Sequence, residues 1–462
     1  MGGAAAPPRR RRSAGALGAG VLVLYGPLSG LSYIPVSVVL GAQIGLTGPQ
    51  VGLTVGAHAL AAAVGSLVLG PLLDLHPVRR VLPLALLVNA LASLALCLDP
   101  TYALLLGGRL VTGFTSSAAM LCAYVVVSDA ARHDDVRRDR TLSLLQTFMS
   151  VGAACALALG ALAASAGRPR WVFAVLAVYG VAMLAVSLRS PLLRTAGARP
   201  AGAAPPDTRR MAREVGGLVR QRRVLALMLG SLVLGLVIQG SHFGVSLLLE
   251  ERSATISAAE RVLLSVLIPV GVFTGSSLAR QLLRRRTRES LYQRLYLGLP
   301  LAVLLHAGAT AWAGEAAQAA GLLLVGCFLG AMMPLSTALG IGWFPDLRGS
   351  ATAAESLARG AGATLGPVAV GAVAAAWTNP VAVLAVAAAA LVGLAASRGV
   401  SRGPAAPVPD AHVPDAPVPD AGAPGGAPDP GSSVPVLDAG AAREDEPRGG
   451  RAAGGLSPPG RP

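Results

Sequence analysis

Residues 101–128 read TYALLLGGRLVTGFTSSAAMLCAYVVVS and contain one charged side chain, Arg109. A membrane-spanning helix needs about 20 mostly apolar residues, because roughly 30 Å of hydrocarbon is crossed at 1.5 Å per residue. This segment is long enough to span a bilayer. An arginine inside a span is costly, so it points to a water-filled cavity or a polar partner. The segment therefore predicts a transmembrane helix in which Arg109 has a functional role.

Eleven further segments meet the same length criterion. The first six spans are expected at 16–41, 50–73, 81–98, 101–128, 142–166 and 170–189, and the second six at 224–248, 262–283, 294–313, 318–344, 350–376 and 379–397. Backbone groups in a bilayer must be hydrogen-bonded within the protein, so each span is expected to be a helix. The sequence predicts an all-α polytopic membrane protein with twelve transmembrane helices.

The overall composition agrees with a membrane protein. Hydrophobic residues make up 53% of the chain and charged residues 13%, against about 25% charged residues in soluble domains. The net charge of +15 does not indicate nucleic-acid binding, because aromatic residues are only 4% and the arginines lie between the apolar segments. The cysteines and histidines lack metal-ligand spacing, so we expect no metal site, no cofactor and no enzymatic activity.

The arginines are distributed unevenly between alternate connections. One set of connections, including the N-terminal tail, holds 24 arginines, and the opposite set holds 4. Short cytoplasmic loops of membrane proteins are enriched in positive charge. We therefore expect both termini to be cytoplasmic, in a multi-pass protein of a bacterial inner membrane.

The connections divide the chain into five regions. Residues 1–15 are expected to form a basic cytoplasmic tail, 16–189 and 224–397 two six-helix bundles, and 190–223 a cytoplasmic loop. The Arg-rich end of this loop fits a helix on an anionic inner leaflet, or a solvated basic linker. Residues 398–462 contain 14 prolines in 65 positions and are expected to be disordered.

Two motifs carry charges at the ends of spans or inside them. The first runs from Gly70 through Asp74 to Arg79 and Arg80. A carboxylate at a helix end followed by a tight turn and paired arginines can form a charge clasp that is made in one conformation and broken in another. The second motif is Arg109-Leu-Val-Thr-Gly113, in the span quoted above.

The two motifs, together with the arrangement of six spans plus six, resemble those of the major facilitator superfamily. The resemblance covers about residues 16–397. Within that family the N-terminal half is similar to the twelve-span drug:proton antiporters, but Gly152 and Gly160 in span five lack the proline of the antiporter signature. The resemblance implies two pseudo-symmetric six-helix bundles, a cavity near the bilayer midplane and alternating access. Leu75, Pro77 and Val78 depart from the family's loop pattern, which predicts a weaker or rearranged clasp.

We therefore expect a secondary active transporter that exports a small drug-like or metabolite molecule in exchange for protons, as a monomer. The alternative is proton-coupled uptake of a sugar, organic acid or amino acid by the same fold. The sequence has no P-loop motif that would power a primary pump. A substrate-sensing receptor would instead bind its ligand without flux.

Candidate coupling residues are few. Arg109 and Gly113 belong to the second motif, and Glu355 and Arg359 are four residues apart, so they can pair on one helical face. Glu355 is thus a candidate proton site or half of a structural ion pair. His242 is a candidate proton relay, or a buried packing residue.

Further candidates concern conformational change and the substrate path. Gly362, Gly366 and Pro367 allow close helix contact and a hinge, for gating or for packing alone. Polar or adaptable side chains within spans could line a cavity. These candidates are Tyr25, Tyr33, Gln146, Gln239, Met332 and Ser336.

Overall fold

The chain divides into a unit of residues Met1–Ala405 and a second unit, Ala406–Pro462. The computed structural model describes parts of the first unit only. These are residues 9–98, 100–130, 135–190, 217, 220–283, 285–312, 314–343 and 348–401. Most of the expected N-terminal tail, central loop and C-terminal tail therefore lies outside the described residues.

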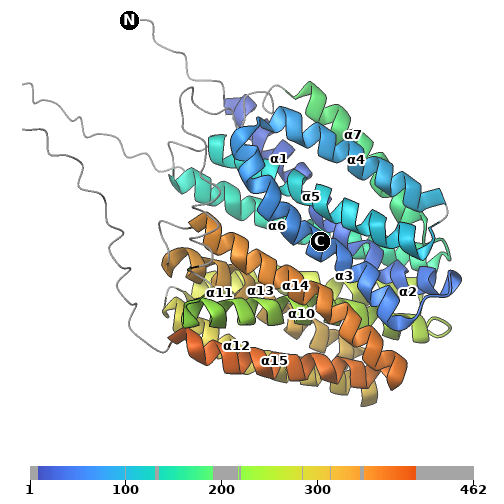
Figure 1. The fold of residues 1–462 in the computed structure, drawn as a ribbon. Coiled ribbons are helices and arrows are strands. Elements are labelled where there is room, and N and C mark those ends of the chain that lie inside the picture. The colour runs from blue at the N-terminus through green and yellow to red at the C-terminus, as the bar shows by residue number, and fades with distance from the viewer. Residues whose placement is uncertain are drawn as a thin grey trace, which may run out of the picture. The chain divides into compact units, whose positions relative to one another are not determined.

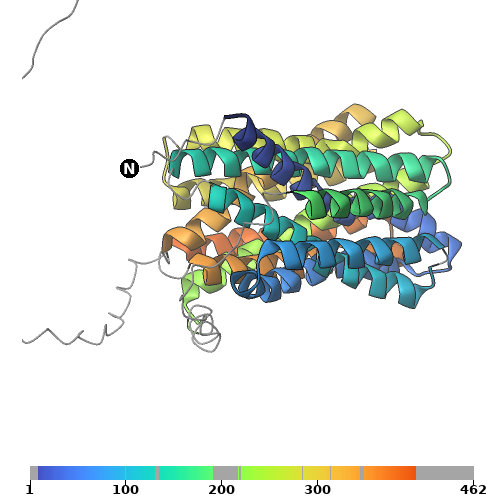
Figure 2. The same cartoon turned by 90° about the horizontal axis from the view of Figure 1, so that it is seen from above.

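The described residues form helices joined by short connections. The first half consists of α1 (Arg9–Leu31), α2 (Tyr33–Gln43), α3 (Gly48–Leu75), α4 (Val78–Leu98), α5 (Tyr102–Ala130), α6 (Asp135–Ser165) and α7 (Trp171–Arg189). The second half consists of α10 (Arg222–Glu251), α11 (Ala258–Leu282), α12 (Arg288–Trp312), α13 (Glu315–Trp343), α14 (Arg348–Ala376) and α15 (Asn379–Ser401). The helices run back and forth along one direction (Figures 1 and 2).

The first expected span, 16–41, is not a single helix. α1 ends at Leu31 and α2 begins at Tyr33. Pro35 has no N–H to donate to the carbonyl of Leu31, and its ring crowds that carbonyl, so the helical ladder is interrupted here. The break leaves carbonyl groups at the end of α1 without partners inside the helix.

The two halves repeat the same helix pairings. In the first half α1 and α2 pack on α6, α3 on α5, and α4 on α7. In the second half α10 packs on α14, α11 on α13, and α12 on α15. With α1 and α2 counted as one span, the pairings have the same order in both halves. The predicted all-α fold of two pseudo-symmetric six-helix bundles is thus confirmed.

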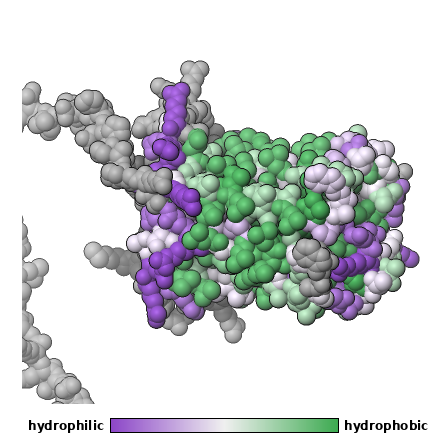
Figure 3. All heavy atoms as spheres, turned by 90° about the horizontal axis from the view of Figure 1, so that it is seen from below, coloured by the Kyte–Doolittle hydropathy of each residue, from purple (hydrophilic) through white to green (hydrophobic). Residues whose placement is uncertain are grey.

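The surface of the helical unit fits a bilayer. Among the described residues, eleven segments are long and apolar enough to cross a membrane, and Gly20–Gln43, which includes the break, is one of them. α12 is the remaining helix, and it begins with the charged residues Arg288 and Glu289. On the face that Figure 3 shows, apolar side chains form a broad band across the middle of the unit, with polar side chains toward both ends.

The two ends of the unit differ in charge. We call the end that carries Arg79, Arg80, Arg222 and Arg223 the Arg-rich end, and the opposite end, where α3 begins at Gly48, the Arg-poor end.

The two halves meet most extensively along α3 and α14, and also between α6 and α11 and between α2 and α10. The α3–α14 contact lies mainly in the half of the molecule toward the Arg-poor end, and glycines allow it. A Cβ added at Gly48 would lie 2.5 Å from the carbonyl oxygen of Gly371, and one at Gly52 would lie 2.3 Å from that of Pro367. The Thr364 hydroxyl also donates to the Gly56 carbonyl at 3.0 Å. We call this contact the seam.

Candidate functional site

Arg109 is fully enclosed in the first half, about 10 Å along α5 from the Arg-poor end at 1.5 Å per residue. Its Nη1 donates to the Ser29 carbonyl at 2.8 Å and its Nη2 to the Gly30 carbonyl at 3.0 Å. Its Nε donates to the Thr54 carbonyl at 3.4 Å. The guanidinium also stacks over the Tyr33 ring, 4.5 Å from its centroid. We call this the Arg109 site.

The break between α1 and α2 explains why a cation is stable at this position. Ser29 and Gly30 lie in the last turn of α1, where carbonyls lack helical partners and the helix dipole is negative. Two of these carbonyls accept from Arg109, and the Leu28 carbonyl accepts from the Ser32 hydroxyl. The sequence predicts a water-filled cavity or a polar partner for Arg109. The contacts found among the described residues are backbone carbonyls and an aromatic ring, so this site needs no change of protonation to be satisfied.

Gly113 has a separate reason to be a glycine. A Cβ at this position would lie 2.3 Å from the backbone oxygen of His58 on α3. The Arg109–Gly113 motif therefore directs a charge toward α1 and brings α5 into direct backbone contact with α3. His58 is itself buried between these helices, with its Nε2 3.5 Å from the Ser116 hydroxyl.

Tyr25 and Tyr33 have different surroundings, although both were candidates for lining a cavity. The Tyr33 hydroxyl shares a 2.8 Å hydrogen bond with Thr54, beside Arg109. The Tyr25 hydroxyl donates to the Asn89 side chain on α4 at 2.8 Å, and its ring stacks on Tyr179 of α7. Tyr25 thus points toward the helices at the periphery of the first half, α4 and α7.

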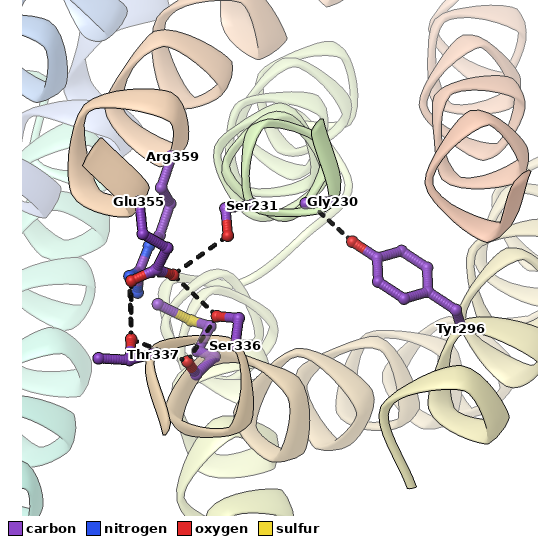
Figure 4. Close-up of polar contacts among 8 residues, drawn as sticks. Gly230, Ser231, Tyr296, Ser336, Thr337, Glu355 and Arg359 are labelled. Carbon is purple, nitrogen blue, oxygen red and sulfur yellow. Dashed lines mark hydrogen bonds and ion pairs between the residues drawn. The ribbon is translucent and has the colours of Figure 1, made fainter. Parts of the chain in front are cut away.

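The second polar centre surrounds Glu355 on α14 (Figure 4). The Glu355 side chain is 3% exposed and forms an ion pair with Arg359, with 2.6 Å between Oε1 and Nη2. Oε1 also accepts from the hydroxyls of Ser231 at 3.1 Å and Ser336 at 2.8 Å. Oε2 accepts from the Thr337 hydroxyl at 2.8 Å. We call this the Glu355 site, and it joins α10, α13 and α14.

The partners of the Glu355 carboxylate all carry donor groups. Three hydroxyls and the Arg359 guanidinium surround its two oxygens. Removing one partner of a buried ion pair typically costs about 3–5 kcal/mol. Arg359 is less enclosed than Glu355, with 22% of its side chain exposed, and lies close enough to Tyr124 on α5 to interact with it electrostatically. The site therefore has a buried acid and a cation at its edge.

The two charged sites lie at opposite depths. Glu355 is seven residues into α14, so it lies about 10 Å from the Arg-rich end at 1.5 Å per residue. Arg109 lies at a similar depth below the Arg-poor end. The structure therefore does not bring Arg109 and Glu355 together into one site.

The small residues of α14 face two different helices. Cβ atoms added at Gly362 and Gly366 would meet backbone atoms of Leu232 and Leu236 on α10. The backbone of Pro367, by contrast, lies against Gly52 of α3 in the other half. Gly362 and Gly366 thus pack within the second half, whereas Pro367 is part of the seam.

Other candidates are described only in part. α3 ends at Leu75, and the His76 N–H donates to the Leu72 carbonyl at 2.8 Å before α4 begins. Arg79 and Arg80 are exposed after this turn, and Gly70 has open space where a Cβ would be. The side chains of Asp74 and Gln146 lie outside the described part of the structure, so the expected clasp does too.

Three cavity candidates lie in the second half. Met332 is buried in its core and Ser336 binds Glu355. The Gln239 Oε1 atom on α10 is buried without a hydrogen-bond partner among the described residues. His242 lies one turn further along α10, next to the first half, and lines a narrow pocket with residues of α6 and α11.

Sequence analysis missed the hydroxyl partners of Glu355. Ser231 and Thr337 are ordinary residues in apolar spans, and helices often hold such residues by bonds to their own backbone. One signal could have identified Ser231 and Thr337. Several neighbouring spans have a serine or threonine one or two turns from the end, at the depth of Glu355, the only acid in span eleven.

The comparisons with known proteins agree on one family. The family model described as Major Facilitator Superfamily matches residues 17–339. A curated relative, the uncharacterized MFS-type transporter YdgK of Bacillus subtilis (strain 168), is 27% identical over 191 residues, which are 40% of this chain and 47% of the relative. The chain thus matches about half the length of that relative.

Solved structures share the fold. A mutant of the nucleoside transporter NupG superposes with a TM-score of 0.72 at 15% identity, covering 84% of this chain and all of that chain. A bacterial homologue of the human lysosomal transporter Spinster, in an inward-facing and unoccupied conformation, superposes with a TM-score of 0.65 at 16% identity. The match covers 85% of this chain and 98% of that chain. The family match over residues 17–339, together with the repeated helix pairings in the described residues, shows that the chain belongs to the major facilitator superfamily, whose members are membrane transporters and not enzymes.

Proposed function

We propose that this protein is a proton-driven secondary transporter that exports a small organic molecule by alternating access, with Glu355 as the proton-binding group. One observation carries the proton coupling. Among the acidic side chains that the structure describes, Glu355 is the only one that is buried. A group whose charge changes in the membrane interior is what proton coupling requires, and buried ionisable residues in spans are usually functional.

The partners of Glu355 make its protonation state matter to the conformation. When Glu355 is ionised, it holds Arg359 and accepts from hydroxyls on α10 and α13. When it is protonated, it loses its charge attraction to Arg359, and the oxygen that carries the hydrogen must donate, so at least one of the four contacts must reverse or break. Hydrogen bonds to a neutral acid are weaker than hydrogen bonds to a carboxylate, so proton binding weakens the contacts of α14 with α10 and α13.

α14 also supplies a route from the proton site to the rest of the molecule. Glu355 lies in its second turn, and the seam with α3 begins at Gly360 and extends to Gly371. A change in how α14 is held at one end thus reaches the contact that joins the halves at the other end. Opening the seam toward the Arg-poor end is the movement that alternating access requires.

The direction of transport is proposed from composition. The spans hold few acids, amides and aromatic residues, which suits amphipathic substrates better than sugars, and this supports export. The resemblance to the drug:proton antiporters favours the same direction. The alternative is proton-coupled uptake of a sugar, organic acid or amino acid. The arginine distribution supports an inner-membrane protein with both termini in the cytoplasm, and we expect it to act as a monomer.

The test is accumulation of defined compounds in an efflux-deficient bacterial host with and without the protein. The panel should include ethidium, benzoate, glucose and uridine, the last because one structural neighbour is a nucleoside transporter. Lower accumulation of a compound that a protonophore reverses would support export, whereas higher accumulation that the protonophore abolishes would support uptake.

Glu355→Gln tests the proton site itself. The amide keeps the size of the side chain and mimics the uncharged acid, so we expect the protonophore-sensitive gradient to vanish. Exchange of labelled for unlabelled substrate across proteoliposomes should persist, because exchange needs no net proton movement. The matched control is Glu251→Gln, since Glu251 is exposed at the Arg-poor end. A Glu355→Gln protein that still builds a proton-driven gradient would contradict the proposal.

A further inference from the structure

A narrow gap lies between the two halves, and in this conformation it has no room for a water molecule. It shares no residue with the Arg109 site or the Glu355 site. Its walls come from α6 of the first half and from α10 and α11 of the second. The lining residues are Leu157, His242, Val245, Ser246, Leu264, Ser265 and Ile268. We call this the His242 pocket. His242 is 20 residues into α10, so the pocket lies about 30 Å from the start of that helix, in the half toward the Arg-poor end.

His242 is an unusual residue to leave in such a place. It is only 5% exposed, and neither of its ring nitrogens has a hydrogen-bond partner among the described residues. Buried polar atoms in native proteins are nearly always paired, and leaving one unpaired costs about 1–3 kcal/mol. A transporter alternates between conformations, so a group that lacks a partner in one of them can have it in another.

The two serines restrict what that partner can be. The Ser246 hydroxyl donates to the His242 carbonyl at 3.0 Å, and the Ser265 hydroxyl donates to the Arg261 carbonyl at 2.8 Å. Since each hydroxyl has one hydrogen, both serines present only acceptor lone pairs to the pocket. The neutral imidazole of His242 adds one acceptor nitrogen and one N–H donor. A ligand group that fits must therefore supply an N–H or O–H donor to the acceptors and an oxygen or nitrogen that accepts from the ring N–H, as a hydroxyl or an amide does.

The lining also argues against a charged ligand group. None of the seven lining residues is an acid, an arginine or a lysine. The nearest ion pair joins Arg261 and Glu250 at 3.1 Å, one helical turn from Ser265, and Arg261 also binds the Leu249 carbonyl. Both charges of that pair are thus already engaged with each other.

The position between the halves gives the pocket a way to open. Leu157 belongs to the first half, and every other lining residue belongs to the second. When the halves separate at the Arg-poor end, the Leu157 side must move away from His242. We propose that the His242 pocket is a substrate-binding subsite on the transport path, which takes an uncharged hydroxyl or amide group of the transported molecule through His242, Ser246 and Ser265. This inference rests on the proposed transport function and names the chemistry of its substrate.

The test uses the purified full-length protein with its four cysteines replaced by alanine. Val245→Cys places a thiol of similar size in the pocket wall and keeps His242 and both serines. Its rate of alkylation by N-ethylmaleimide reports access to the pocket. Two uncharged donor-rich probes, uridine and glucose, are compared with benzoate as an anion and tetraethylammonium as a cation. The measurement needs no proton gradient, so it is independent of whether Glu355 carries the proton.

We expect slow alkylation of Val245→Cys that uridine or glucose retards and that benzoate and tetraethylammonium do not. Adding His242→Leu should raise the half-protecting concentration roughly five- to tenfold, the effect of one lost hydrogen bond. His306→Leu is the matched control, because His306 is also buried in the second half with unpartnered ring nitrogens but lies on α12.

Three results would overturn the inference. The first is a thiol that never reacts in folded protein, which would make the pocket a permanent part of the core. The second is protection by a charged probe, or by none of the four. The third is equal loss of protection with His242→Leu and His306→Leu, which would show an indirect effect of stability.

Discussion

Replacing Gly52 with valine should shift the protein toward a conformation that is open at the Arg-poor end. A Cβ at this position would lie 2.3 Å from the Pro367 oxygen, 2.6 Å from its carbonyl carbon and 2.8 Å from the Val368 nitrogen. All three atoms belong to the backbone of α14, so no side chain can rotate away. The contact must lengthen by about 1.1 Å, the difference between 2.3 Å and the ordinary contact distance of 3.4 Å.

The size of the shift follows from the cost of overpacking. Inserting methyl groups into a well-packed contact costs about 1–3 kcal/mol. The open conformation separates α3 from α14, so this cost falls on the closed conformation alone. At 1.36 kcal/mol per factor of ten, the ratio of open to closed protein should rise roughly 5- to 160-fold.

The assay is the alkylation rate of Val245→Cys in the cysteine-free protein, which should rise with the open population. The matched control is Gly308→Val on α12, because a Cβ added there would meet nothing within 4 Å. Equal alkylation rates for Gly52→Val and Gly308→Val, in proteins that elute and melt alike, would refute the view that the α3–α14 seam closes this end. The same view would be refuted if alkylation of Gly52→Val became faster only after the protein had unfolded.

Two further predictions concern the motifs in the first half. Arg109→Ala should leave the Ser29 and Gly30 carbonyls without donors and so lower the free energy of unfolding by about 2–3 kcal/mol. It should also abolish proton-coupled flux. The control is Arg168→Ala, at an exposed arginine, which should change neither stability nor flux. Thermal melting in detergent and counterflow in proteoliposomes measure the two effects, and normal active transport by Arg109→Ala would show that the site is dispensable. Asp74→Asn should slow the exchange between conformations, because it removes the charge of the expected clasp. Unchanged alkylation of cysteine reporters at both ends would show that this loop is inert.

Much of the fold could be predicted because it depends on length and polarity along the chain. Twelve apolar segments, separated by loops rich or poor in arginine, suffice to indicate helices and their alternation. The Glu355–Arg359 pair could also be anticipated, since residues four apart meet on one helix. These features depend on neighbours in sequence.

The direction in which each side chain points could not be predicted in the same way. A helix that is apolar on all sides shows little periodicity, so Tyr25 and Tyr33 look alike in sequence although one points toward α4 and the other toward Arg109. The break after Leu31 had a signal in Pro35, but membrane helices often tolerate proline without breaking. That break decides which carbonyls receive Arg109, so the partner of the arginine could not be foreseen either.

The two charged sites differ in what can change them, and this difference makes a symmetric fold functionally asymmetric. Arg109 is bound by backbone carbonyls, which do not titrate and which are free to accept because the helical hydrogen bonds are interrupted between α1 and α2. Glu355 is bound by side chains on three helices, and protonation removes the charge that holds them. α14 carries Glu355 and also contacts α3 across the seam. In the proposed mechanism, proton binding in the second half therefore alters the contact between the halves, while Arg109 holds the end of α1 without a change of charge.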